Sequence, residues 1–292
     1  MSTLSIKLTS KQIEELYIQY KDYLTDTSND LITFQIDYNK TIITVYNTNK
    51  VVFQGLNTDV FAKKYNCYID TNNTNNKNNN DINSDSHAGS DESGTGDYFG
   101  PVVVVACIVN KTDINFVKEL NVDDSKKLQD HNILDIAPKL MNKLTYSVLV
   151  LENSHYNKIY NSNNLNAIKA KLHNKAYLNL KDKAKLPSNC IIDQFAPEKT
   201  YYKYLINEPE IFKNLIFETK AESKYYAVAC ASIIARYTLL NHFQLMKKHY
   251  NFDFALGGGA QADECAKRFV KQFGYQQLSN VCKLHFKNTK KL

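Results

Sequence analysis

The spacing of apolar residues indicates a small folded unit at the start of the chain. A short apolar stretch is followed by a segment whose apolar residues recur at helical spacing, and Ser10 is a candidate N-cap for this predicted helix. The apolar positions of the helix are Ile13, Leu16, Tyr17, Tyr20 and Leu24. Three β-branched or aromatic runs follow at residues 31–38, 41–46 and 50–55, separated by Asn- and Lys-containing turns. The pattern predicts an α+β unit built from a strand, a helix and an antiparallel meander.

A low-complexity segment follows this unit. Residues 70–85 are rich in asparagine and contain almost nothing that a core could bury, which is typical of a flexible linker. Such a tether lets two flanking units engage one ligand together. We therefore expect a small N-terminal unit at 1–69, a linker at 70–85 and a main domain at 86–292.

The main domain opens on a pattern that combines acids, glycines and a buried strand. Asp91 and Glu92 precede the turn Gly94-Thr95-Gly96, and residues 102–109 are all apolar, which predicts a strand buried on both faces. The glycines at 94, 96 and 100 permit positive φ and close backbone approach. The carboxylate pair should lie near the edge of a core, although a hairpin with solvated acids also fits these residues.

Later patterns predict alternating strands and helices. Strands are expected at 145–152, 190–193 and 211–217, and a helix at 165–180. Pro197 opens a further helix. A long helix with a face of alanine and serine should begin near Glu222.

Two further acids stand where such elements meet. Asp193 ends a short apolar strand, where a carboxylate is costly unless a cation pairs with it or it caps the next helix. Glu222 lies near the predicted start of the long helix, where a plain capping acid is the alternative. Asp124 or Ser125 could cap another helix and leave Lys126 and Lys127 able to reach a phosphate, although this motif by itself is weak and fits a solvated helix end better.

Charge and composition narrow the class of protein. The net charge of +6 is uneven, because residues 99–292 carry 28 Lys and Arg against 17 Asp and Glu. A basic body around a local group of acids suggests a polyanionic ligand together with bound cations. The six cysteines form no Cys-x-x-Cys pair and the seven histidines show no ligand spacing, so we expect buried thiols and ordinary core or surface histidines. No apolar run is long enough for a membrane span, and we expect a cytoplasmic protein without a membrane partner.

Taken in order, these motifs resemble bacterial ribonuclease HIII, and the resemblance covers nearly the whole chain. The segments that carry it are 91–101, 124–128, 193–195, 220–223, 231–236 and 283–286. The resemblance implies a ribonuclease-H-like mixed five-stranded sheet flanked by helices. It also implies an N-terminal domain similar to half of a TATA-box-binding protein, which serves to bind substrate. The long Asn-rich linker departs from the family pattern.

The resemblance also assigns roles to residues. It implies that Asp91, Glu92, Asp193 and Glu222 are catalytic and hold two Mg²⁺ or Mn²⁺ ions, which prefer oxygen ligands. Such ions support in-line hydrolysis at phosphorus, leaving a 5′-phosphate and a 3′-hydroxyl. The substrate would be the RNA strand of an RNA–DNA hybrid, and the protein a monomer. Expected substrate-binding residues are Gly94, Thr95 and Gly96, at the ribose 2′-hydroxyl, and Ser125, Lys126 and Lys127.

Two other functions remain compatible with the sequence. A hybrid-binding protein that does not cleave would gain nothing from four acids amid a basic surface. Another two-metal nuclease on the same fold, such as an integrase-like DNA-processing enzyme, would lack the Gly-Thr-Gly turn and would not require ribonucleotides.

Overall fold

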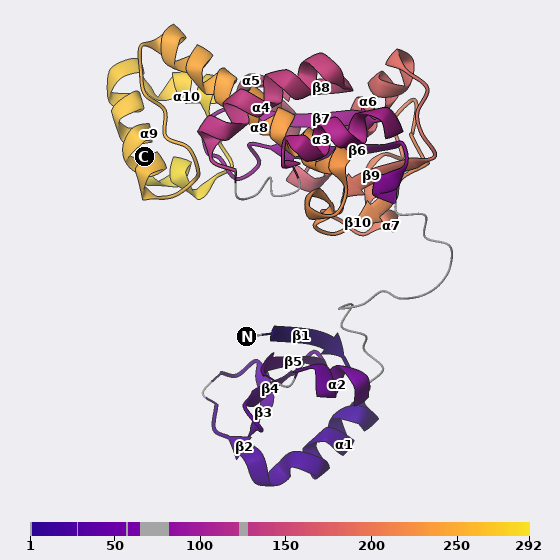
Figure 1. The fold of residues 1–292 in the computed structure, drawn as a ribbon. Coiled ribbons are helices and arrows are strands. Elements are labelled where there is room, and N and C mark those ends of the chain that lie inside the picture. Colours follow the sequence, from indigo (N-terminus) through magenta and orange to yellow (C-terminus); the bar gives the residue numbers. More distant parts are fainter. Residues whose placement is uncertain (1, 28, 57, 65–81, 123–127) are drawn as a thin grey trace. The chain divides into compact units, whose positions relative to one another are not determined.

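The fold was analysed in a computed structural model that describes residues 2–27, 29–56, 58–64, 82–122 and 128–292. The chain divides into two compact units, Met1–Asn78 and Asn79–Leu292 (Figure 1). The division falls within the segment 70–85 that we predict to be a linker, most of which lies outside the described residues. Each unit has its own apolar core.

The N-terminal unit is a five-stranded antiparallel sheet with two helices, in the strand order β1-β5-β4-β3-β2. Its elements are β1 (Ser2–Lys7), α1 (Ser10–Tyr20), β2 (Leu24–Thr25), β3 (Ile32–Tyr38), β4 (Thr41–Tyr46), β5 (Lys50–Gly55) and α2 (Thr58–Lys64). Leu16 of α1 and Phe61 of α2 pack with Ile43 and Phe53 of the sheet, so both helices contribute to one core. This is the predicted combination of strand, helix and meander.

Two details of the predicted helix in this unit are wrong. The cap is Thr9 rather than Ser10, because the Thr9 side chain and Gln12 exchange hydrogen bonds in a capping box. The helix also ends at Tyr20, one turn before Leu24. A 3-10 turn, Lys21–Tyr23, follows it, and Leu24 then starts β2, where it pairs with Ile36.

The C-terminal unit is built on the mixed sheet β10-β9-β6-β7-β8, in which β10, β9 and β6 pair in parallel and β7 pairs antiparallel with both β6 and β8. Its strands are β6 (His87–Ser93), β7 (Val102–Val109), β8 (Thr145–Leu151), β9 (Asn189–Asp193) and β10 (Ile216–Glu218). Its helices include α3 (Ile114–Glu119), α4 (Asp130–Lys143), α5 (Asn153–Tyr160), α6 (Leu165–Lys183), α7 (Glu198–Tyr204), α8 (Tyr226–Tyr250), α9 (Ala260–Phe273) and α10 (Leu278–Val281). The mixed five-stranded sheet flanked by helices is confirmed.

Strand β7 is central to this core because it is buried on both faces. Its residues alternate in direction, so Val103 and Val105 pack in the cluster that contains α4 and α8, and Val104 packs in the cluster that contains α6. Helices therefore cover both faces of the sheet, while α9 and α10 lie at one end of the unit (Figure 1). None of the described helices is both long and apolar enough to span a bilayer.

Two predicted elements of this unit differ from the structure, and a third lies outside the described residues. The strand expected at 211–217 is reduced to Ile216–Glu218, because Phe212 packs on Tyr177 of α6 instead of pairing with β9. Helix α8 begins at Tyr226, so Glu222 lies outside it, in the separate 3-10 turn Ala221–Ser223. The cap predicted at 124–125 lies outside the described residues, and the next described helix, α4, begins at Asp130.

Candidate active site

The four candidate acids meet at one edge of the mixed sheet. Asp91 and Glu92 lie near the end of β6, and Asp193 ends the adjacent parallel strand β9. Glu222 follows β10, which runs parallel to β9 and pairs Glu218 with Asp193. Because parallel strands end at the same sheet edge, the chain order of these elements brings together acids that are far apart in sequence.

Asp91 is in an unfavourable place for a negative charge. It is 8% exposed. Burial raises its pKa well above the ordinary range, and the neighbouring charges of Glu92 and Asp193 raise it further. Hydrogen bonds from Ser232 and from the Glu92 backbone N–H, at 2.7 Å, oppose this rise without cancelling it. A nearby positive charge or a bound proton is therefore needed to stabilise the Asp91 carboxyl group.

Asp193 and Glu222 form a second unfavourable group. Burial raises the pKa of Asp193, and the nearby charge of Glu222 raises it further. The Ala221 backbone N–H, which donates to Asp193 Oδ1 at 2.8 Å, opposes this effect. Glu222 is 3% exposed and lies before α8, so it is neither solvated nor in the first turn of that helix.

Glu92 differs from the other acids because two cationic or hydrogen-bonding side chains of α6 contact it. His173 Nε2 lies 2.9 Å from Glu92 Oε2, and the Lys169 ammonium forms an ion pair with Oε1. Burial would raise the pKa of Glu92, but the hydrogen bond and charge of His173, and then Lys169, outweigh it and lower the pKa. From the sequence, His173 was expected to be an ordinary histidine and no role was predicted for Lys169. The signal that could have identified them is their i, i+4 spacing on the buried face of one helix.

The Gly94-Thr95-Gly96 turn directly follows β6, at the edge of the sheet where the four acids lie. Gly94 has φ +88°, and a Cβ there would approach the Pro101 carbonyl oxygen at 2.2 Å, so this position requires glycine. Gly96 differs from the prediction, since it does not have positive φ and a Cβ there would meet nothing within 4 Å. Thr95 is half-buried and Gly96 is exposed, so part of the turn faces solvent.

A buried lysine near the C-terminus holds the segment after the turn. Lys283 is fully buried, and its Nζ donates to the carbonyl oxygens of Asp97, at 2.8 Å, and Gly100, at 2.6 Å. The Asp97 carboxylate also accepts from the Gly257 backbone N–H at 2.5 Å. Burial lowers the pKa of Lys283 to about 8. Lys283 belongs to a segment that carries the family resemblance, but no role was predicted for it.

Comparisons with known proteins agree with this arrangement. The family model "Ribonuclease HII" matches residues 88–289, and "Domain of unknown function (DUF3378)" matches residues 3–79. A protein named ribonuclease HIII from Streptococcus mutans is 39% identical, over 100% of this chain and 97% of its own length. A second ribonuclease HIII, from Bacillus cereus, is 38% identical over 99% and 97%. The crystal structure of Bst-RNase HIII in complex with Mn²⁺ has a TM-score of 0.71 and 35% identity, covering 99% of this chain and 97% of that one.

The chain belongs to the ribonuclease HIII family. It is therefore a ribonuclease H-type enzyme with a ribonuclease-H-like catalytic fold, as the motifs implied.

The acids of this ribonuclease HIII chain have the chemistry to hold divalent cations. Among the described residues, no three His, Cys, Asp or Glu side chains already form a group shaped for a metal ion. The donor set nevertheless fits one, because Asp91 and Asp193 have raised pKa values in the presence of other carboxylates, and a hard cation would relieve that repulsion.

A cavity of about 300 Å³ opens beside Glu92. Its polar lining includes Ser93, Ser232 and Arg236, and the Arg236 guanidinium forms two hydrogen bonds, of 2.9 and 3.0 Å, with Asp130 at the start of α4. The predicted substrate-binding residues Ser125, Lys126 and Lys127 precede this helix but lie outside the described residues.

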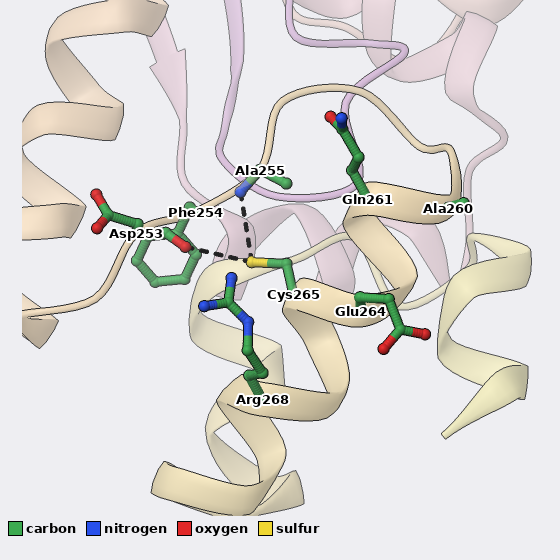
Figure 2. A pocket seen from close by; sticks show the side chains of 8 residues that line it. All are labelled: Asp253, Phe254, Ala255, Ala260, Gln261, Glu264, Cys265 and Arg268. Carbon is green, nitrogen blue, oxygen red and sulfur yellow. Dashed lines mark hydrogen bonds between the residues drawn. The ribbon is translucent and has the colours of Figure 1, made fainter.

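A second cavity, of about 520 Å³, lies at the start of α9 and contains none of the four acids (Figure 2). Cys265 lines it, and its thiol lies 3.4 Å from both the Asp253 carbonyl oxygen and the Ala255 backbone nitrogen. These contacts tie Cys265 to the loop before α9. Burial raises the pKa of the thiol, so Cys265 is a poor nucleophile.

Proposed function

We propose that this ribonuclease HIII chain hydrolyses the RNA strand of RNA–DNA hybrids at internal positions and leaves 5′-phosphate and 3′-hydroxyl ends. One observation carries the proposal: four acids from β6, β9 and the turn after β10 converge at a sheet edge, where two of them have raised pKa values. A protein that only binds a polyanion has no use for such a group, because uncompensated carboxylates repel phosphate.

Asp91, Glu92, Asp193 and Glu222 would hold two Mg²⁺ or Mn²⁺ ions. When bound, such ions promote attack of water on the scissile phosphate and stabilise the leaving 3′-oxygen. The chain's own contribution is to bury the carboxylates and to fix them from several elements. Hydrogen bonds from Ser232 to Asp91 and from Ala221 to Asp193 orient two of the acids.

The exposed side of the Gly94–Gly96 turn supports a second part of the proposal. Its backbone amides would hydrogen-bond the ribose 2′-hydroxyl, the group that distinguishes RNA from DNA. Lys283 keeps the following segment in place, because it binds two of its carbonyl groups. Ser125, Lys126 and Lys127 are proposed to contact substrate phosphates, and the N-terminal unit to bind the hybrid.

The experiment compares end-labelled RNA–DNA hybrid, duplex DNA and duplex RNA, each incubated with the full chain in Mg²⁺, Mn²⁺ or EDTA. We expect cleavage of the hybrid alone, only with a divalent ion, and products that a 5′-phosphate-dependent exonuclease degrades. Cleavage of duplex DNA at a comparable rate would instead support a DNA-processing nuclease. Tight hybrid binding without cleavage in either metal would support a non-catalytic binding protein.

A further inference from the structure

Helix α6 sends two polar side chains from its buried face to a single carboxylate. Lys169 and His173 are four residues apart and therefore lie on the same side of the helix. His173 is fully buried and Lys169 is 8% exposed. Lysine is rarely buried to this extent without a partner, because removing its charge from water is costly.

Each oxygen of the Glu92 carboxylate has its own partner in this arrangement. Oε2 lies 2.9 Å from His173 Nε2, and Oε1 forms the ion pair with the Lys169 ammonium. Both side chains of the ion pair are largely shielded from solvent, at 10% and 13% exposure. Two directional contacts on one carboxylate fix its rotation as well as its position.

The two α6 residues are themselves held in place by the segments that carry other acids. His173 Nδ1 lies 2.8 Å from the hydroxyl of Ser90, the residue before Asp91. The Lys169 ammonium lies 4.0 Å from the ring centroid of Phe195, two residues after Asp193, and the His173 and Phe195 rings are 5.4 Å apart. The contacts therefore link β6, α6 and the end of β9.

We propose that Lys169 and His173 are positioning residues that hold Glu92 in a single orientation, with its charge balanced, so that it is ready to bind a divalent ion. This inference rests on the proposed function and extends it to two residues that do not touch the substrate. Groups that orient metal ligands in this way typically change metal affinity or activity 10- to 100-fold when they are removed. A purely structural pair would affect folding stability without affecting the metal dependence.

The test measures Mn²⁺ binding by calorimetry without substrate, and separately measures kcat and KM for hybrid cleavage. Lys169→Met and His173→Ala are each expected to weaken Mn²⁺ binding about tenfold and to lower kcat at least as much, with KM for the hybrid unchanged. Lys169→Arg and His173→Gln, which keep a charge or a donor, should recover part of both losses. Lys175→Met, at an exposed position of the same helix, is the matched control and should match the wild type.

A second comparison shows whether the effect passes through Glu92. In the Glu92→Gln background, adding Lys169→Met should weaken Mn²⁺ binding no further, because the carboxylate that Lys169 holds is absent. Unchanged Mn²⁺ affinity in the folded Lys169→Arg, His173→Gln and Lys169→Met proteins would overturn the positioning role. Failure of the wild type to cleave a hybrid would contradict the proposed function, while the Mn²⁺ comparison would still test the positioning role.

Discussion

Asp91 and Glu92 are neighbours on β6 and burial raises the pKa of both, yet the pKa of Asp91 is raised overall and that of Glu92 is lowered. Successive side chains of a strand point to opposite faces. Glu92 meets Lys169 and His173 of α6, which lower its pKa, whereas Asp91 meets Ser232 of α8 and the charges of other acids. The pair can therefore supply one carboxylate that is already ionised and one that a bound cation would ionise.

Glu222 provides a test at the scale of one residue, because its role as a metal ligand and a role in helix capping predict different results. Glu222→Gln should cut the rate of hybrid cleavage by about two orders of magnitude or more, since it removes a ligand charge. Glu222→Asp keeps the charge on a shorter arm and should retain part of the rate.

Cleavage rates and thermal melts of the two Glu222 variants should be measured together. A capping acid would change stability by roughly 1 kcal/mol or less and leave turnover intact. Full activity of Glu222→Gln with a small shift in melting temperature would remove Glu222 from the site and leave three acids.

At the scale of elements, the turn between β6 and β7 places two glycines under different constraints. Gly94→Ala should destabilise the protein by about 1–3 kcal/mol, because the new Cβ meets the Pro101 carbonyl and φ is positive. Gly96→Ala, the matched control, should stay within about 0.5 kcal/mol of the wild type. Urea unfolding of both variants checks this, and equal stabilities would mean that the backbone strain at Gly94 is relieved elsewhere.

Lys283 makes the stability of the same region depend on pH. Its pKa is about 8 in the folded protein against an ordinary value of 10.5, so between these values the unfolded chain binds more protons. The stabilising contribution is fully present above 10.5 and is lost as pH falls through about 8. Over the whole range it amounts to roughly 3 kcal/mol.

The stability of the wild type relative to Lys283→Met should therefore increase from pH 7 to pH 10. Urea unfolding of both proteins at several pH values measures this difference, and other titrating groups largely cancel in the comparison. A difference that stays constant with pH would show that Lys283 has an ordinary pKa.

The elements that the sequence predicted well are those that local patterns specify. The β-branched run 102–109 and the strand before Asp193 were predicted almost to their ends. The strand expected at 211–217 was too long because the packing of Phe212 on Tyr177 depends on where α6 lies. The contact of His173 with Glu92 was missed for the same reason, since 81 residues separate the two.

The candidate site, like the fold, could be predicted only as far as local sequence motifs specify it. Asp91, Glu92, Asp193 and Glu222 could be named from motifs, and the structure brings them to one edge of the sheet. Motifs could not show that Glu222 lies in its own 3-10 turn before α8, because a capping acid and a buried ligand share the same local sequence. Their common role in binding metal remains a prediction.

At the scale of the whole molecule, each unit has a separate core, so removing one should leave the other folded. Deleting residues 1–70 should weaken binding of an RNA–DNA hybrid at least about tenfold, because a tethered second binding unit raises effective concentration. The rate of the chemical step should change much less, since all four proposed metal ligands lie in the second unit. Fluorescence anisotropy and single-turnover kinetics measure the two effects separately, and unchanged affinity would make the N-terminal unit a structural accessory.

The most direct test of the four-acid site is single-turnover cleavage of a labelled RNA–DNA hybrid in Mn²⁺ by three variants. Asp91→Asn, Glu92→Gln and Asp193→Asn should each abolish cleavage while circular dichroism shows a folded protein, because each removes one metal ligand and little volume. Near-wild-type turnover with unchanged Mn²⁺ dependence in any one of the three would contradict the proposal that these carboxylates together hold the catalytic ions.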